Sequence, residues 1–347
     1  MKLDDLDTPS VICDLDILER NLEDMAARCR NLGIPFLSHT KAHKIPELAH
    51  LQLRSGASGI ICQKIGEAEQ MVAAGLTDIL IPYNIVGPVK LERLSRLARR
   101  ARMTVAVDSE ATARGISGQA STDGVEISVL IEVDTGAGRC GVQSPDEAVS
   151  LAKTISTLPG LQYDGIMTYP SQPESKAPLD AVVSALRAAD LSPPRISGGG
   201  TGHEQISKDI GCTETRSGSY IWEGLSRIKS SQDLNPDRCP LRVLCTVISV
   251  PVPGRVIIDG GMKTFASYPP IPYGECAEYP GVRFSKMSVE HGLLDATGSS
   301  HQFQVGERVS MIPLHQEMCL NLHDELVGYR GDQVEVIWPV AGRGKVK

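Results

Sequence analysis

The sequence predicts a (β/α)8 barrel followed by a mostly β domain. Eight strand-like runs alternate with helical patterns between residues 36 and 216, and beyond about residue 240 strand patterns continue without such helices. A doubly wound sheet would produce a similar alternation, so the number of strands alone does not select the barrel. Residues 10–14 form one strand-like run more than a barrel needs, and we assign them to the β domain.

Composition is that of an ordinary soluble protein and excludes few classes. Of 347 residues, 41% are hydrophobic and 22% charged, and the formal net charge is −7, which argues against nucleic acid as a partner. No apolar run is long enough to span a membrane, and the first ten residues are too acidic for a signal peptide. Nine cysteines without a CxxC motif indicate reduced thiols in a cytoplasmic protein.

The order of elements follows from the pattern of apolar residues and their punctuation. After the strand at 10–14, Asp16 opens a helix that Gly33 ends. The strands predicted for the barrel are 36–39, 57–62, 78–82, 103–107, 126–134, 163–168, 194–197 and 212–216. The helical patterns between them cover 46–54, 64–74, 88–101, 110–116, 145–157 and 178–190.

One helix has an explicit start signal. Ser144, Pro145 and Glu147 form a capping box with proline at the first helical position. The sequence therefore predicts that the fifth of these helices begins at residue 145.

The C-terminal part reads as strands and turns. Residues 243–261 form a strand, a turn and a second strand, and 309–313 and 334–338 are further strands with no convincing helix between them. We therefore expect a barrel domain at residues 15–236 and a β domain at 237–347, which residues 1–14 join.

The stretch Pro35–Lys44 is the first candidate for chemistry. It places His39, Lys41, His43 and Lys44 just past a predicted strand. A lysine that is partly desolvated and close to other cations favours the neutral amine, which attacks carbonyl groups. A solvated basic turn before a helix explains the same residues equally well.

Other candidates follow from the position of active sites in barrels, at the carboxyl ends of the strands. Gln63, Arg139 and Tyr169 each follow a predicted strand. The run 197–202, with three consecutive glycines, follows the seventh strand, and 216–220 follows the eighth, where barrels often bind phosphate. Lysine, arginine and an anion cradle in this order suit a pyridoxal phosphate site.

Residues 136–141 match the dinucleotide fingerprint GxGxxG, but the match is misplaced. The next helix starts only at Pro145, after the third glycine, so a phosphate would miss its N-terminus. We therefore do not predict a dinucleotide site here.

The motifs HTKAHK, CQKIGEAE, EVDTGAGRCGV, SGGGTG and RSGSYIWEG resemble the fold-type III pyridoxal phosphate enzymes, whose N-terminal barrel is alanine racemase-like. They are most similar to the branch of D-threonine aldolase, D-serine dehydratase and the 3-hydroxyaspartate aldolases and dehydratases. The stretches DGGMK, EHG and PLHQEMCLNLHDELVGYRGDQVEVIWPVAGRGK extend the resemblance over nearly the whole chain. It implies a barrel plus a β domain and a homodimer.

The resemblance also implies residue roles. Lys41 would form the Schiff base with pyridoxal phosphate, Arg139 would face the ring nitrogen, and Gln63 and Tyr169 would line the pocket. The phosphate would be held by Gly199, Gly200, Thr201, Ser219 and Tyr220. His43 and Tyr169 are further catalytic candidates, although a lone histidine is more often structural.

The metal site of this branch is a histidine and a second ligand two positions later, cysteine in the dehydratases and aspartate in the aldolases. Here these positions are His315 and Glu317. Residues two apart on a strand share a face, and a histidine–carboxylate pair suits Mn²⁺ or Mg²⁺. Cys319 could instead bind Zn²⁺, and a surface loop without metal is the third alternative.

The resemblance therefore implies a lyase. We expect a metal-dependent aldolase that cleaves D-configured β-hydroxy-α-amino acids to glycine and an aldehyde. A dehydratase that releases ammonia is the second hypothesis, and an amino-acid racemase, which needs no metal, is the third. The non-enzymatic alternative is a cofactor-carrier protein, although such carriers usually lack the β domain.

Overall fold

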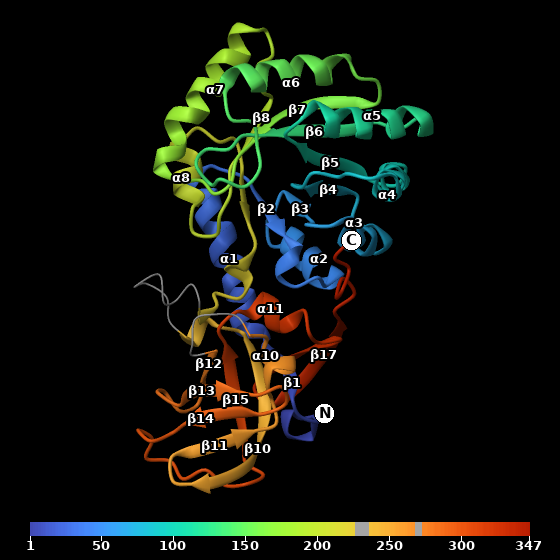
Figure 1. Cartoon of the computed structure of the whole chain (residues 1–347). Helices are drawn as coiled ribbons and strands as arrows, with labels where there is room; N and C mark the ends of the chain where they lie inside the picture. The colour runs from blue at the N-terminus through green and yellow to red at the C-terminus, as the bar shows by residue number, and fades with distance from the viewer. Residues whose placement is uncertain (226–235, 268–272) are drawn as a thin grey trace. The chain divides into compact units, whose positions relative to one another are not determined.

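A computed structural model describes residues 1–225, 236–267 and 273–347 (Figure 1). The chain forms two compact units. One comprises Met25–Lys41, Pro46–Gly218 and Lys345–Lys347, and the other Met1–Asp24, Ala42–Ile45 and Ser219–Gly344. The domain boundary expected at residue 237 stays a prediction, because compact units need not coincide with folding domains.

The first unit contains the barrel, and the predicted fold class is confirmed. Its parallel strands pair in the order β8-β7-β6-β5-β4-β3-β2-β9. A single bridge between Ser197 and Glu214 joins the two ends of this sheet, which makes the barrel nearly closed. The strands are β2 (Phe36–His39), β3 (Gly59–Ile61), β4 (Asp78–Ile81), β5 (Arg102–Val107), β6 (Ile127–Glu132), β7 (Leu161–Met167), β8 (Arg195–Ser197) and β9 (Thr215–Ser217).

Alternation along the strands divides the barrel core into two layers. One cluster packs side chains from alternate positions of six neighbouring strands: Leu37, Ile61, Leu80, Ala106, Leu130 and Met167. Their neighbours along the same strands, such as Ile60, Ile79 and Val129, face the other way. They belong to a second cluster together with helix residues such as Met71 and Leu94. The first cluster therefore fills the inside of the barrel, and the second packs the helices against its outside.

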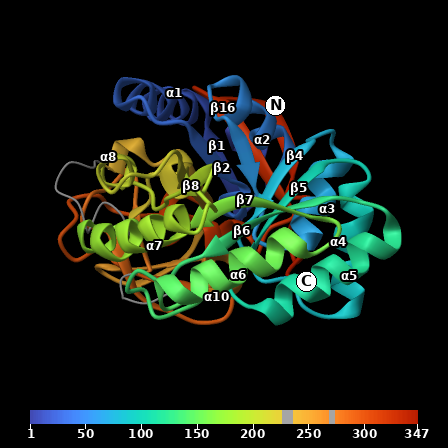
Figure 2. The same cartoon turned by 90° about the horizontal axis from the view of Figure 1, so that it is seen from above.

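The helices of this unit surround the strands. In Figure 2, α4 to α7 follow one another around the outside of the sheet. The helices are α2 (Pro46–Arg54), α3 (Ile65–Ala73), α4 (Pro88–Ala98), α5 (Glu110–Asp123), α6 (Pro145–Thr157), α7 (Lys176–Ala188) and α8 (Glu204–Asp209), and α1 (Leu15–Leu32) precedes them.

Local capping explains where the helices begin and end. The Ser144 side chain accepts from the Glu147 N–H at 3.2 Å, and α6 begins at Pro145, as predicted. Helix α5 is longer than the predicted 110–116, because Ser109 caps its start and Gly124, with a φ of 64°, ends it. Helix α8, with six residues, is too short to show a periodic pattern.

The second unit is built on a nine-stranded sheet in the order β11-β14-β13-β12-β15-β10-β1-β16-β17, and β11 also pairs with β10. The six strands from β11 to β10 therefore close on themselves, and β1, β16 and β17 extend from β10. The strands are β1 (Ser10–Asp14), β10 (Leu241–Val252), β11 (Arg255–Ile258), β12 (Gly274–Cys276), β13 (Arg283–Met287), β14 (Gly292–Asp295), β15 (Arg308–Pro313), β16 (Glu325–Arg330) and β17 (Gln333–Pro339).

The expectation of no helix in this part of the chain is wrong. Helix α10 (Met262–Phe265) follows β11, and α11 (Gln316–Leu320) lies between β15 and β16. Both helices have five residues or fewer, so their sequences show no helical periodicity. The second of them contains Glu317, which changes the geometry expected for the metal candidates.

Two further properties follow from the described residues. All nine cysteines are free thiols. In the described part of the chain, no helix is both long and apolar enough to cross a membrane.

Candidate active site

Lys41 lies directly after the first strand of the barrel. Strand β2 ends at His39, and Lys41 is the middle residue of the 3₁₀ turn Thr40–Ala42. The Thr40 hydroxyl donates to the carbonyl oxygen of Ile61 at 2.9 Å and so ties this turn to β3. Lys41 is half-buried at the carboxyl end of the barrel strands, where barrel enzymes hold their reactive groups.

His39 and Gln63 form a fixed pair beside Lys41. The Lys41 N–H donates to His39 Nδ1 at 3.4 Å, and His39 Nε2 lies 2.9 Å from Gln63 Oε1. His39 therefore carries its proton on Nε2 and is neutral, because Nδ1 accepts. Burial, and then the charge of Lys41, hold the pKa of His39 well below its ordinary value.

Arg216 is the middle residue of β9 and lies inside the barrel. It is 5% exposed, and burial lowers the pKa of its guanidinium to about 10. Nη1 donates to Ser197 Oγ at 2.6 Å, and Nη2 donates to the carbonyl oxygen of Thr168 at 2.7 Å. Arg216 also contributes to the low pKa of His39, so the two side chains share one polar region.

The glycine-rich segment passes close to Arg216 and Tyr169. A Cβ atom on Gly199 would lie 3.2 Å from Arg216 Nη2 and 3.2 Å from Tyr169 Cδ2. Glycine at this position therefore allows the backbone, the guanidinium and the aromatic ring to meet.

Three backbone donors of the predicted anion cradle already have protein acceptors. Gly199 N donates to Ser171 Oγ at 2.9 Å, Gly200 N to the Arg216 carbonyl at 2.9 Å, and Gly218 N to Thr201 Oγ1 at 3.1 Å. An anion here would either displace such acceptors or bind to other donors.

Arg139 and Tyr169 are brought together from the ends of β6 and β7. The Arg139 guanidinium lies 5.1 Å from the centre of the Tyr169 ring, and its Nη2 lies 3.3 Å from Glu132 Oε1. Burial raises the pKa of Glu132. Arg139 is more exposed than Arg216, since 54% of its side chain is accessible.

The fingerprint-like loop at 136–141 directs its backbone donors to carboxylates of the protein, Asp134 and Asp108. The N–H groups of Gly136 and Gly138 donate to the Asp134 carboxylate at 2.9 and 3.2 Å. This loop is a turn around Asp134, and α6 begins only at Pro145.

Three of the residues predicted for catalysis or cofactor binding belong to the other unit. Ser219 and Tyr220 start the 3₁₀ turn Ser219–Ile221, and Tyr220 is 2% exposed. His43 is 1% exposed, and its Nδ1 accepts from the Ile45 N–H at 3.0 Å. One ring nitrogen of His43 therefore holds the backbone turn.

The metal candidates do not lie on a strand, so the reason given for their shared face is wrong. His315 is the N-cap of α11 and its Nδ1 accepts from the Met318 N–H at 3.4 Å, while Glu317 is in the first turn. Cys319 is fully buried and donates to the Thr264 carbonyl at 3.3 Å. Among the described residues, no three His, Cys, Asp or Glu side chains gather around one point.

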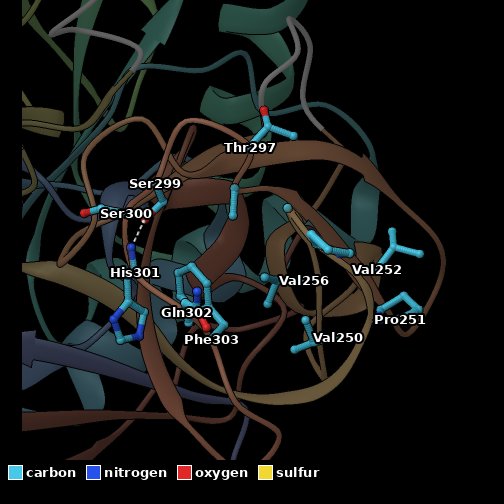
Figure 3. Close-up of a pocket in the computed structure, with 13 residues that line it drawn as sticks. Val250, Pro251, Val252, Val256, Thr297, Ser299, Ser300, His301, Gln302 and Phe303 are labelled. Atoms are coloured by element: carbon cyan, nitrogen blue, oxygen red, sulfur yellow. Dashed lines mark hydrogen bonds between the residues drawn. The ribbon is translucent and has the colours of Figure 1, made fainter.

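A hollow of about 580 Å³ lies elsewhere in the second unit, between the β10–β11 turn and residues 296–303 (Figure 3). Valine and proline side chains line much of it. His301 at its edge has Nε2 2.6 Å from Glu307 Oε1 and stacks on Tyr279 with 4.3 Å between ring centres. Its ring is engaged in structural contacts, and we assign no chemistry to this hollow.

Comparison with known proteins identifies the family. Residues 13–225 match the alanine racemase N-terminal domain, and residues 240–329 match the putative serine dehydratase domain. The chain belongs to the family of the alanine racemase N-terminal domain.

Alignments of this alanine racemase-like chain with known relatives cover almost its whole length. It is 35% identical to a D-threonine aldolase from an Arthrobacter species, and 34% identical to a 3-hydroxy-D-aspartate aldolase from Paracoccus denitrificans. Each alignment covers 98% of this chain and 93% of the relative. The crystal structure of D-threonine aldolase from Filomicrobium marinum superposes with a TM-score of 0.93 at 34% identity, covering 100% of this chain and 98% of that one.

Within this alanine racemase-like barrel, sequence reasoning gave Arg216 no individual role. It lies in a predicted strand, and a charged residue inside a buried strand must be paired. That signal could have singled it out, whereas its partners Ser197 and Thr168 are visible only in the folded chain.

Proposed function

We propose that the chain is a pyridoxal phosphate- and divalent metal-dependent aldolase, which cleaves D-configured β-hydroxy-α-amino acids to glycine and an aldehyde. One observation carries most weight: identity of 35% over 98% of the chain to a D-threonine aldolase, with Lys41 at the carboxyl end of a barrel strand. The β-substituent of the substrate, methyl or carboxylate for example, stays open.

The described residues suit an anionic aromatic cofactor. Arg216 and Arg139 supply two cations, Tyr169 supplies a ring, and Gly199 leaves space between them. His39 is neutral, so the amine of Lys41 has one fewer cation beside it. Pyridoxal phosphate, when bound, withdraws electrons from the bonds at the α carbon of an amino acid.

The chain's own groups would then hold and orient this cofactor. Lys41 would bind it covalently through Nζ, Gln63 and Tyr169 would line its pocket, and Arg139 would approach the ring nitrogen. Gly199, Gly200, Thr201, Ser219 and Tyr220 would hold the phosphate. The Thr201 hydroxyl accepts from the Gly218 N–H at 3.1 Å, which links the glycine-rich segment to the residues after β9. His43, whose Nδ1 accepts from the Ile45 N–H, would be a further catalytic candidate.

His315 and Glu317 would bind the metal. An imidazole and a carboxylate suit Mn²⁺ or Mg²⁺, with the remaining positions left to water and substrate oxygens. With only two protein ligands the ion would be accessible to a substrate hydroxyl, whose proton it makes easier to remove. Cys319 is less suited as a ligand, because burial raises the pKa of its thiol and the thiol donates to Thr264.

The cofactor is tested by visible absorbance. We expect purified protein reconstituted with pyridoxal phosphate to show the visible absorbance band of the lysine-bound cofactor. The variant Lys41→Ala should lose both this band and the activity. Lys90→Ala, which removes an exposed lysine of α4, is the matched control and should keep both. A band of equal intensity in Lys41→Ala would contradict the role of Lys41.

The second candidate is a dehydratase that converts the same substrates to a keto acid and ammonia. It is favoured by the match of residues 240–329 to the putative serine dehydratase domain. The two lyases differ in their products, so a product assay separates them.

We further propose a homodimer, which the resemblance implies, and a cytoplasmic location, which the free thiols suggest. Light scattering of the purified protein tests the dimer.

A further inference from the structure

A continuous series of polar side chains runs through the barrel unit. Arg216 Nη1 donates to Ser197 Oγ at 2.6 Å, and Ser197 Oγ donates to Glu214 Oε1 at 2.5 Å. Glu214 Oε1 also lies 2.8 Å from Arg195 Nη2, and Arg195 Nη1 donates to Asp164 Oδ2 at 3.0 Å. We call these five residues the barrel polar series.

The series joins two ends of the barrel. Arg216 lies in β9, whereas Asp164 and Arg195 line a separate hollow together with residues from the starts of other strands, such as Asp78 and Arg102. Glu214 also lines that hollow, and the Ser197 hydroxyl connects Glu214 to Arg216.

The direction of the bonds in this series is fixed by chemistry. A guanidinium only donates and a carboxylate only accepts, so the Ser197 hydroxyl must accept from Arg216 and give its one proton to Glu214. Ser197 is fully buried, and Glu214 is 9% exposed. The charge of Glu214 therefore acts on Arg216 through a hydroxyl in a region of low dielectric, where such interactions are strong.

Two arginines thus depend on one carboxylate. Arg195 has Asp164 as a second acidic partner, whereas Arg216 donates to two uncharged acceptors, the Ser197 hydroxyl and the Thr168 carbonyl. Burying a cation is costly unless an anion compensates it. Glu214 contributes the largest such compensation for Arg216 and opposes the effect of burial on its pKa.

The other end of Arg216 faces the residues to which the cofactor is assigned. Its Nη2 approaches the backbone of Gly199, which also meets the Tyr169 ring. A cation held at this place changes the electron distribution of an aromatic cofactor beside it.

We propose that Glu214, acting through Ser197, is a positioning residue that holds the charged guanidinium of Arg216 against the cofactor pocket. This inference rests on the proposed function, since it needs pyridoxal phosphate as the occupant. It predicts that the two residues act in series, so that losing either one has the same consequence.

The test uses the full-length protein reconstituted with pyridoxal phosphate, in the variants Glu214→Gln, Ser197→Ala and the double variant. Glu214→Gln removes the charge at almost unchanged shape, and Ser197→Ala interrupts the series. The matched control is Asp164→Asn, which loses an acidic partner of Arg195 but no contact of Ser197 or Arg216. Three quantities are measured: the dissociation constant of the cofactor, its absorbance maximum, and the melting temperature of the cofactor-free protein.

We expect both single variants to raise the dissociation constant about 10-fold, the size of one charged hydrogen bond, and to move the absorbance maximum in the same direction. The double variant should be no weaker than the weaker single variant, because residues in one network are not additive. Asp164→Asn should lower the melting temperature while it keeps the dissociation constant within about 2-fold of the wild type, an order-of-magnitude allowance for a group at the far end of the series that contacts neither Ser197 nor Arg216.

Unchanged affinity and absorbance in Ser197→Ala would overturn the inference, even if Glu214→Gln does not fold. Additive effects in the double variant would also overturn it. If the wild type itself binds no pyridoxal phosphate, the proposed function fails and the inference with it. Normal binding by the wild type and by both single variants would refute the inference alone.

Discussion

At the scale of single residues, the candidate site keeps one histidine neutral beside a lysine. His39 accepts from the Lys41 N–H and lies against Gln63, and both its burial and the Lys41 charge oppose protonation. A protonated His39 would add a second cation next to Lys41. The neutral form of His39 therefore leaves one positive charge fewer beside Lys41.

This neutrality has a consequence for stability. In the unfolded chain His39 gains a proton as the pH falls through about 6.5, its ordinary pKa, whereas in the folded protein it stays neutral. The unfolded state then binds more protons, so folding stability falls as the pH drops below that value. One proton accounts for at most about 1.4 kcal/mol per pH unit.

We expect His39→Gln to remove this contribution. Urea unfolding of the cofactor-free protein between pH 7.5 and 5.5 should show a smaller loss of the free energy of unfolding in the variant than in the wild type. Equal losses in the two proteins would mean that His39 is protonated in the folded state as well.

Candidate residues that lie just past strand ends could be predicted from the sequence, whereas Ser197 and Glu214 of the barrel polar series were not singled out. Lys41, Gln63, Arg139 and Tyr169 all lie just past barrel strands, because the carboxyl ends of parallel strands share one edge. Ser197 and Glu214 were not singled out, since their part in the series comes from bonds between residues 17 positions apart. Such pairs become visible only when the strands are placed side by side.

At the scale of elements, α11 shows what short helices hide from sequence analysis. Residues 309–314 are mostly apolar and read as a strand, and the prediction for the metal site places His315 and Glu317 on one face of a strand as well. In the structure β15 ends at Pro313, and His315 caps a helix of five residues. The metal candidates are therefore the cap and the first turn of α11, where a carboxylate is favoured by the helix N-terminus.

Within α11, Glu317 and Cys319 have different surroundings, because Cys319 is fully buried and Glu317 is not. We expect Glu317→Ala to lose bound Mn²⁺ and activity, because its carboxylate is the proposed ligand. Cys319→Ala should keep both, because this thiol is buried and bonded to Thr264. EDTA should abolish activity and Mn²⁺ should restore it. Metal content and activity are measured on the same preparations, with Asp324→Ala, an exposed neighbour, as the control.

Two outcomes would contradict this assignment. Loss of metal in Cys319→Ala with full metal in Glu317→Ala would favour the thiolate site. Full activity in a metal-free preparation would remove the metal from the account.

At the scale of the whole chain, the alternation of strands and helices is a strong signal and the closure of sheets is a weak one. All eight barrel strands lie within a few residues of their predicted positions, because each is bounded by glycine, proline or a helix start. The surplus strand at 10–14 is β1, which pairs with β10 and β16 in the nine-stranded sheet. The return of β11 to β10, which closes six strands, leaves no trace in the residue pattern.

The measurement that tests the central claim most directly is a product analysis with the protein loaded with pyridoxal phosphate and Mn²⁺. D-threonine should yield glycine and acetaldehyde in equal amounts, D-configured 3-hydroxyaspartate should yield glycine and glyoxylate if it is a substrate, and L-threonine should remain unchanged. Release of 2-oxobutanoate and ammonia from D-threonine would identify the dehydratase instead. Comparable turnover of L- and D-threonine, or no turnover of any β-hydroxy amino acid, would contradict the proposed aldolase.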